Sequence, residues 1–200
     1  FQKVLKTLYI ESLESALFVL KEPHRLRTKR REGKFEENEL NEGDARFWYA
    51  RGNVVTEFLD KLWQVAWAPI AQEVDKQIDF RGRTERQRQL YLYVASQAKL
   101  KQLGDPVGGT DSFFRYAEGA YIGDLIEEVR ITVKKRDEHG GKVSFTQLSE
   151  GEQQLLTVLG MMRITRDDQC LFLLDEPDTH LNPLWKLRLF DEINDAMSNE

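Results

Sequence analysis

The feature that most constrains this chain is a run of apolar residues, Cys170 to Leu174, that ends in the acidic pair Asp175 and Glu176. Polar residues precede the run, and Pro177 follows the pair. Such a run is typical of a strand that is buried on both faces of a parallel sheet. Side chains at the carboxyl end of such a strand point into the crevice where α/β folds bind ligands. The pattern therefore predicts that the acidic pair lines a ligand site.

The chemistry of the acidic pair points to phosphoryl transfer. An acid that follows such a strand holds the Mg²⁺ of a bound nucleotide, usually through water. A glutamate beside it can take a proton from the attacking water. Asp175 is therefore the candidate Mg²⁺ ligand, and Glu176 is the candidate general base. The alternative is that two acids merely end a strand, but the order Asp-Glu-Pro-Asp over 175–178 favours the catalytic interpretation.

A second pattern, one helix earlier, predicts a helix start that could meet phosphate. Ser149 with Glu152 three residues later is a capping box, and apolar residues at helical spacing follow as far as Ile164. Exposed N–H groups and a serine hydroxyl at a helix start bind phosphate, and Gly151 leaves the backbone accessible there. Glu150 and Glu152 would oppose an anion. A capped helix start is common by itself, and its place shortly before the acidic pair is what makes it informative.

Together these segments resemble the heads of ABC-type ATPases. The segment that resembles the signature motif of that family is Leu148-Ser149-Glu150-Gly151-Glu152-Gln153. Phe172-Leu173-Leu174-Asp175-Glu176 is similar to the Walker B strand, and Pro177-Asp178-Thr179-His180-Leu181-Asn182-Pro183 resembles the D-loop. The sequence of these segments is most similar to that of the PtuA-like ATPases of Septu-type anti-phage systems, variants of which accompany retrons. The resemblance is strong over roughly the last quarter of the chain and weak elsewhere.

The resemblance implies an α/β fold, a P-loop ABC-type ATPase head with an inserted helical lobe. The head is partial, because no Gly-x-x-x-x-Gly-Lys-[Ser/Thr] occurs in the sequence, and we expect the chain to be part of a longer polypeptide that supplies this Walker A loop. Two heads would sandwich ATP and Mg²⁺ as a homodimer or higher homo-oligomer. Ser149 and Gly151 of one head would touch the γ-phosphate held by the other. Asp175 would serve Mg²⁺ and Glu176 would be the base.

The same resemblance implies partners and leaves alternatives open. ATP state would control an associated HNH nuclease of the PtuB kind, and DNA or a retron reverse transcriptase is a further candidate partner. One alternative is an ATPase of the overcoming-lysogenization-defect class that is fused to its own nuclease domain. Another is a chromosome-tethering or DNA-repair head, which the absence of sustained heptads before the signature disfavours. A non-hydrolysing scaffold is disfavoured by the intact acidic pair.

The rest of the chain is predicted to divide into a mainly helical lobe, 1–127, and the C-terminal part of the ATPase core, 128–200. Apolar spacing predicts helices over 1–20 and over 47–78 with a kink at Pro69, and a capping box at Thr84 predicts another. A further helix is expected from Asp111. Alternation over 129–134 predicts a hairpin that returns at 143–145, and 184–197 is expected to be the last helix.

Two basic clusters are candidate contacts for nucleic acid or for a protein partner. The members are Arg25, Arg27, Lys29, Arg30 and Arg31 in the first cluster, and Arg81, Arg83, Arg86 and Arg88 in the second. The first cluster lies beside an acidic stretch, and such neighbouring charge runs usually form a solvated loop, here 24–45. Trp48, Trp63 and Trp67 fall among apolar residues and are interpreted as packing rather than as a base-stacking platform.

Composition indicates the cellular compartment of the protein more than its function. The formal net charge of -5 gives no overall attraction to nucleic acid. The single cysteine, Cys170, excludes an internal disulfide framework and fits a reducing compartment. No apolar run is long enough to cross a bilayer, so we expect a cytoplasmic protein with no membrane partner.

Overall fold

The computed structural model describes the chain except for residues 1, 37–42, 51–52, 105–109, 166–170 and 198–200. The chain forms two compact units. The signature unit comprises Phe1–Glu14 and Ile131–Glu200, and the middle unit comprises Ser15–Arg130. The predicted domain boundary after residue 127 stays a prediction.

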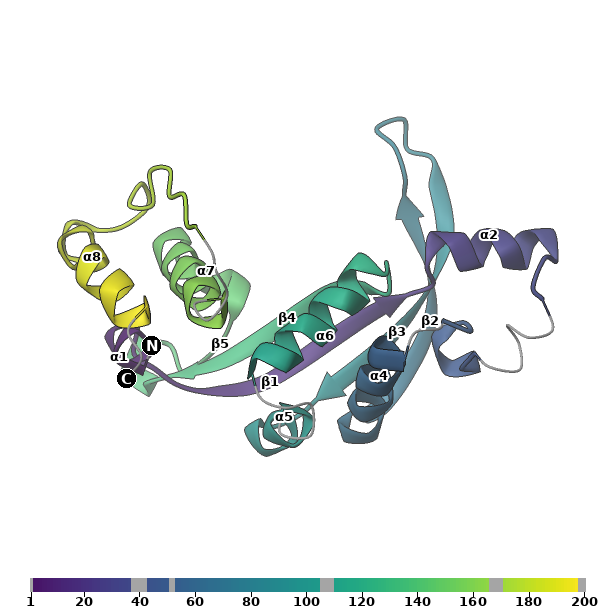
Figure 1. Cartoon of the computed structure of the whole chain (residues 1–200), viewed down its shortest axis with the longest axis horizontal. Coiled ribbons are helices and arrows are strands. Elements are labelled where there is room, and N and C mark those ends of the chain that lie inside the picture. Colours follow the sequence, from purple (N-terminus) through teal and green to yellow (C-terminus); the bar gives the residue numbers. More distant parts are fainter. Residues whose placement is uncertain (1, 37–42, 51–52, 105–109, 166–170, 198–200) are drawn as a thin grey trace. The chain divides into compact units, whose positions relative to one another are not determined.

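The strands form an antiparallel arrangement in the order β2-β3-β1-β4-β5 (Figure 1). Their bounds are β1 Ile10–Lys21, β2 Trp67–Gln77, β3 Thr84–Val94, β4 Ile126–Lys135 and β5 Lys142–Ser144. The pairs β1/β3, β2/β3 and β4/β5 are all antiparallel. The predicted hairpin is confirmed as β4 and β5.

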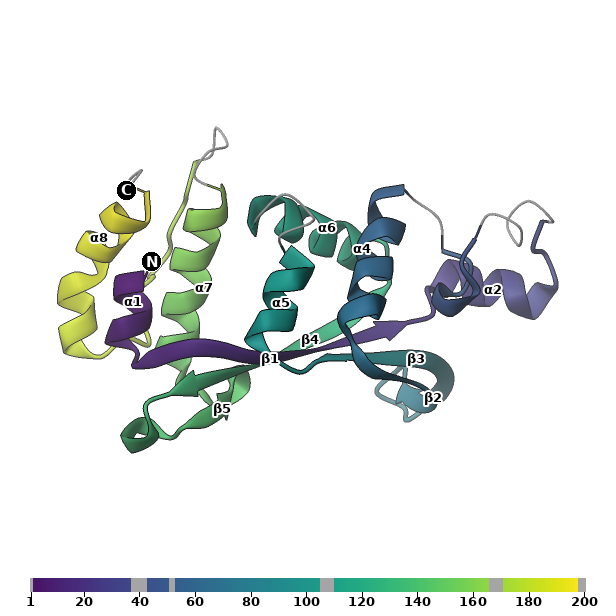
Figure 2. The same cartoon turned by 90° about the horizontal axis from the view of Figure 1, so that it is seen from below.

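The helices of the middle unit are α2 His24–Glu32, η1 Ala45–Phe47, α4 Asn53–Val65, α5 Gln97–Gly104 and α6 Thr110–Ile122. Figure 2 shows α4, α5 and α6 on the same side of the strands. Alternate strand residues such as Phe18, Leu20 and Leu92 are buried there, where they form one core with Phe58 and Leu62 of α4. The helix predicted from Asp111 is confirmed as α6.

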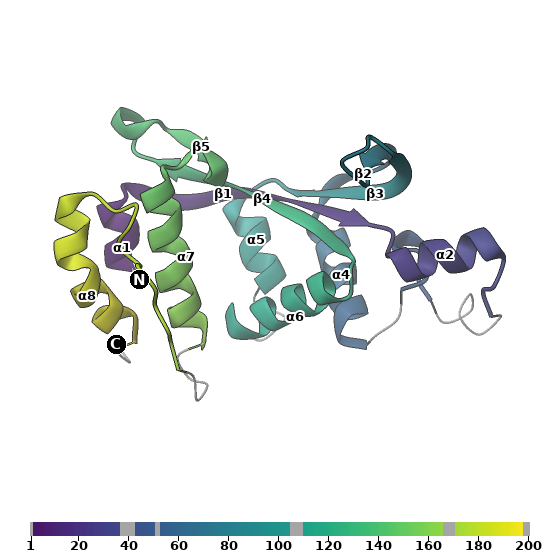
Figure 3. The same cartoon turned by 90° about the horizontal axis from the view of Figure 1, so that it is seen from above.

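The signature unit is built around two helices that pack against each other and were both predicted. Its helices are α1 Gln2–Thr7, η3 Asp137–His139, η4 Phe145–Gln147, α7 Glu150–Thr165 and α8 Pro183–Met197 (Figure 3). Leu155 and Leu159 of α7 form a core with Val4 and Leu8 at the chain start and with Leu189 of α8. This core fixes the start of α7 relative to the segment that leads into α8.

The helix predicted for 1–20 is wrong beyond Thr7. α1 ends there, Tyr9 adopts a φ of 58°, and β1 begins at Ile10. The spacing of apolar residues fits a helix, but Ala16 and Leu20 pair with Val94 and Leu90 of β3. Pairing across the sheet has overridden a periodicity that suited both structures.

The helix predicted for 47–78 is correct only for α4. Trp67 begins β2, and Pro69 lies on this edge strand, where a missing N–H costs no ladder hydrogen bond. The strand is irregular between Trp67 and Ile70. Trp67 is 71% exposed, so its assignment to packing is wrong, whereas Trp48 and Trp63 do pack against the core.

The helix predicted from Thr84 is also wrong, and the loop predicted for 24–45 is wrong over 24–32, while 37–42 lie outside the described residues. Thr84 begins β3, in which Leu90, Leu92 and Val94 alternate toward the core. Residues 24–32 form α2, in which Arg27 pairs with Glu85 and Arg30 pairs with Glu22. The middle unit is therefore a sheet covered by helices and not a mainly helical lobe.

No helix in the described part of the chain is both long enough and apolar enough to cross a membrane.

Candidate functional site

The capped start of α7 is confirmed. The backbone N–H of Ser149 donates to Oε2 of Glu152 at 2.9 Å, and the Ser149 hydroxyl donates to the same oxygen at 3.1 Å. In return the Glu152 N–H lies 3.4 Å from Ser149 Oγ. The side chain of Gln153 donates to the carbonyl of Leu148 at 2.7 Å, which anchors the residue before the cap. Local sequence therefore builds this helix start, as predicted.

Lys135 neutralises the acid that lies nearest to the capped serine. Its Nζ donates to Oε1 of Glu152 at 2.6 Å, and the two side chains are 11% and 15% exposed. Burial by itself would raise the pKa of Glu152, but the bonds from Lys135 and Ser149 outweigh it and lower that pKa below its usual value. Glu152 therefore remains ionised and paired. The sequence interpretation missed Lys135, whose only signal was its place at the end of a strand.

The second acid of the motif, Glu150, lies at the surface. Its Oε2 is 3.3 Å from Nδ1 of His180, and its side chain is 81% exposed. The pair joins the signature motif to the segment that resembles a D-loop. Both acids that would oppose an anion are therefore directed toward partners within the signature unit.

Gly151 is required by a close approach of backbone. A Cβ atom at this position would lie 2.5 Å from the carbonyl oxygen of His180. The first turn of α7 is thus in direct contact with the D-loop-like segment. Any larger residue would force the two apart.

We therefore expect Gly151→Ala to lower the free energy of unfolding by about 1–3 kcal/mol, the usual cost of forcing extra volume into a packed site. Gly160→Ala on the same helix is the matched control, because nothing lies within 4 Å of its added Cβ. That control should be neutral or slightly stabilising. Urea denaturation of the two variants measures the difference, and equal stabilities would contradict the close approach.

Gln154 ties α7 to the turn after the acidic pair. Its Nε2 donates to the carbonyl of Pro177 at 3.0 Å. The sequence interpretation did not single out this residue, because the bond joins segments that only the tertiary structure brings together. Gln154 thus holds the backbone next to Glu176 in place.

The acidic pair lies on an exposed, irregular segment. The strand predicted for Cys170 to Leu174 is absent over Leu171–Leu174, and Cys170 lies outside the described residues. Leu171 and Leu173 are 83% and 85% exposed. A strand needs neighbours to take its hydrogen bonds, and none of the described strands pairs with this run.

The turn after the acidic pair is hydrogen-bonded to Glu176 itself. Glu176 adopts a φ of 43°, and its carbonyl accepts the Thr179 N–H at 3.2 Å and the Thr179 hydroxyl at 2.9 Å. The same hydroxyl lies 3.2 Å from Glu176 Oε2. Asp178 pairs with Lys186 of α8 at 3.2 Å, and buried Leu181 anchors the end of the turn. The three candidate D-loop residues therefore connect the candidate base, α7 and α8.

A family model described as "AAA domain, putative AbiEii toxin, Type IV TA system" matches residues 25–200. This match includes the capped helix and the acidic pair. The chain belongs to this family. No curated protein and no solved structure matches it significantly.

The AAA domain is thus an ATPase domain of the P-loop type, with mixed α/β content and an antiparallel sheet. Membership supports nucleotide binding and ATPase activity in general. It does not distinguish the Septu branch, so the finer assignment stays a prediction.

In the AAA domain, Asp175 fits the role of a single protein ligand for Mg²⁺. Within the described ranges no group of three or more His, Cys, Asp or Glu side chains could hold a metal ion. Mg²⁺ commonly takes one or two carboxylates and completes its shell with water and substrate phosphates. An exposed aspartate suits that arrangement.

The two basic clusters of the AAA domain lie in the middle unit, and most of their cations are paired. Arg30 holds buried Glu22 through two bonds of 2.8 and 2.9 Å. Arg27 and Arg31 both reach Glu85, at 3.1 and 3.5 Å. Two further pairs belong to the second cluster: Arg83 with Asp79 at 2.5 Å and Arg86 with Asp75 at 3.8 Å. Contact of either cluster with DNA or with a protein partner stays a prediction, and this includes the remaining members Arg25, Lys29, Arg81 and Arg88.

Proposed function

We propose that this AAA domain belongs to an anti-phage ATPase of the Septu or retron type, in which ATP binding and hydrolysis control an associated HNH nuclease. Its family description names a type IV toxin–antitoxin system and an AbiEii toxin, which supports a role in defence. The resemblance of 146–183 to PtuA-like ATPases supports the finer assignment.

The observation that carries the proposal is the joining of the helix start and the acidic segment within one unit. The Gly151–His180 contact and the Gln154–Pro177 hydrogen bond hold them together. In the proposed assembly, the start of α7 in one copy faces the γ-phosphate that the other copy binds. A rigid connection between the two segments would let one copy sense the nucleotide state of its neighbour's site.

The residues have separate roles in the proposed reaction. Asp175 would hold Mg²⁺, which would supply positive charge beside the phosphates. Glu176 takes the proton from the attacking water. The Ser149 hydroxyl, which donates to Glu152 at 3.1 Å, turns to the γ-phosphate when the two copies close. Lys135 keeps its own bond to Glu152 and so holds the released carboxylate away from the phosphate.

The function is tested by phage plating on cells that carry the full-length protein with its neighbouring genes. Asp175→Ala should abolish protection and ATP-dependent nucleic-acid cleavage by the purified complex, because Mg-ATP is no longer held. Asp191→Ala, which removes an exposed carboxylate from α8, is the matched control and should protect like the unaltered protein. Full protection by Asp175→Ala would contradict the proposal. If no adjacent gene encodes a nuclease, the alternative of an ATPase that is fused to its own nuclease domain would be favoured instead.

A further inference from the structure

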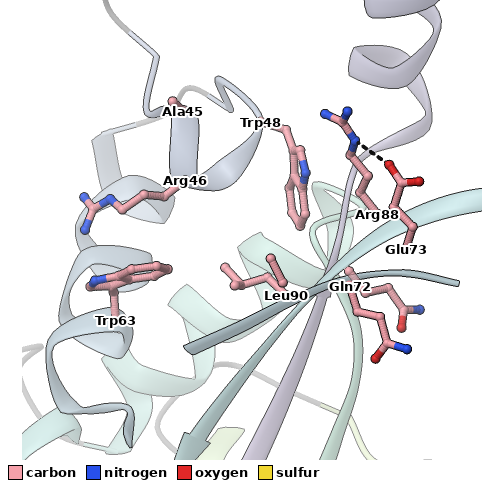
Figure 4. Close-up of a pocket in the computed structure, with 10 residues that line it drawn as sticks. Ala45, Arg46, Trp48, Trp63, Gln72, Glu73, Arg88 and Leu90 are labelled. Atoms are coloured by element: carbon pink, nitrogen blue, oxygen red, sulfur yellow. Dashed lines mark hydrogen bonds and ion pairs between the residues drawn. The ribbon is translucent and has the colours of Figure 1, made fainter. Parts of the chain in front are cut away.

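The middle unit contains a cavity of about 420 Å³ that the nucleotide chemistry above does not use. It lies between η1, α4 and the strands β2 and β3 (Figure 4). The volume is in the range of small-molecule sites. Its lining includes Arg46, Trp48, Trp63, Glu73, Arg88 and Leu90.

Two indoles and a leucine form the apolar walls of the cavity. Figure 4 shows Trp48 and Trp63 on either side of Leu90. Trp63 is held by an edge-on contact with Phe47, with ring centroids 6.1 Å apart, and by the Arg46 guanidinium 5.2 Å from its own centroid. Such fixed aromatic walls suit a flat ligand, because little side-chain freedom is lost on binding.

The backbone that carries Trp48 is strained. Trp48 and Tyr49 have φ values of 55° and 62°, a region that bulky residues rarely adopt. The turn is maintained by Asp44, whose carbonyl accepts the N–H groups of Phe47 at 3.0 Å and Tyr49 at 2.9 Å. Its carboxylate also accepts the Arg46 N–H at 2.8 Å. Strain that the surroundings maintain is typical of ligand-binding segments, and here it sets the position of Trp48.

The polar groups of the cavity offer donors and acceptors side by side. Arg88 Nε lies 3.3 Å from Glu73 Oε1, so a guanidinium and a carboxylate stand next to each other. The edges of nucleobases present the complementary mixture of ring acceptors and N–H donors, and arginine and glutamate are among their usual partners. A purely hydrocarbon ligand would leave this pair unused.

The charge balance disfavours recognition of a phosphate. Arg46 is paired with Asp44 at 2.5 Å and also with Asp60, while Arg88 is paired with Glu73. Both arginines of the cavity lining are therefore already neutralised. The cavity suits the uncharged base of a nucleotide better than its phosphate group.

We propose that this cavity binds a nucleobase, with the heterocycle stacked on Trp48 and its edge bonded to the Glu73–Arg88 pair. The base can come from a free nucleoside or nucleotide, or from single-stranded nucleic acid. The site is separate from the ATP chemistry of the signature unit, so the proposal does not rest on the proposed function.

The test is calorimetric titration of the full-length protein, without Mg²⁺, with the four ribonucleosides and with a ten-nucleotide mixed-sequence single strand. Nucleosides lack the phosphates on which an ATP site depends. At least one probe should bind, and the affinity for a nucleoside should change little with salt because a nucleoside carries no phosphate. Trp48→Ala should weaken binding about 5- to 150-fold, the range found for removal of one stacking aromatic. Trp48→Phe should retain most of it.

Trp67→Ala is the matched control, because Trp67 is an exposed tryptophan of the same unit that lines a different cavity. It should bind like the unaltered protein. If Trp48→Ala does not fold, Arg88→Gln serves in its place and should change the order of preference among the bases. If only the single strand binds, and if Trp48→Ala abolishes this binding, the base comes from nucleic acid.

The proposal is overturned by either of two results. One is that neither the nucleosides nor the single strand binds at millimolar concentration. The other is that binding occurs but survives both Trp48→Ala and Arg88→Gln unchanged.

Discussion

Glu176→Gln in the full-length protein is expected to lower ATP turnover by about 10²- to 10⁴-fold while Mg-ATP stays bound. The carboxamide has nearly the same shape but cannot take a proton from the attacking water. Asp175 remains to hold Mg²⁺. The variant also loses a negative charge near the γ-phosphate, so the ATP-bound dimer should persist longer. Turnover is measured by phosphate release, bound nucleotide by filter binding, and the dimer by gel filtration in ATP.

Glu138→Gln provides the matched control, since its side chain is 70% exposed in the turn between β4 and β5. It should hydrolyse ATP at the normal rate. Normal turnover by Glu176→Gln would remove Glu176 from the role of base. Loss of ATP binding in Glu176→Gln would instead indicate that Glu176, and not Asp175 alone, holds the metal ion.

Sequence patterns succeeded where structure is decided locally. The Ser149–Glu152 capping box specifies a helix start through bonds between residues three apart, and those bonds are present. The alternation over 129–134 predicted β4, which pairs with β5 across a short connection. At Thr84 the same capping pattern failed, because the residues after it alternate and pair with β1. A capping box is informative only when the residues that follow have helical spacing.

The contacts that define the site were less accessible to sequence. Gly151 was singled out as a place of close approach, but the group that approaches it is the His180 carbonyl. Gln154 and Lys135 act through partners that are adjacent only in the folded unit. For the apolar run before Asp175 the sequence predicted too much structure. Its hydrophobicity predicted a buried strand, but none of the described strands pairs with it.

Ser149→Arg is expected to abolish ATP turnover by a different route from Glu176→Gln. The arginine fills the helix start that would face the γ-phosphate of the neighbouring copy, where Ser149 now bonds to Glu152. ATP should still bind within each copy, but the two copies should not close around it. Filter binding should therefore show retained ATP, and gel filtration should show no ATP-dependent dimer.

Because the signature is proposed to act on the neighbour's nucleotide, the defect of Ser149→Arg should be repaired from the neighbour. Asp175→Ala subunits have an intact Ser149 but cannot hold Mg-ATP. In a mixed dimer, the ATP of the Ser149→Arg subunit meets the Ser149 of the Asp175→Ala subunit, which restores one site of two. The mixture should therefore hydrolyse ATP although each variant alone does not. Absence of recovery, in a mixture whose native mass shows mixed dimers, would mean that Ser149 acts within its own copy.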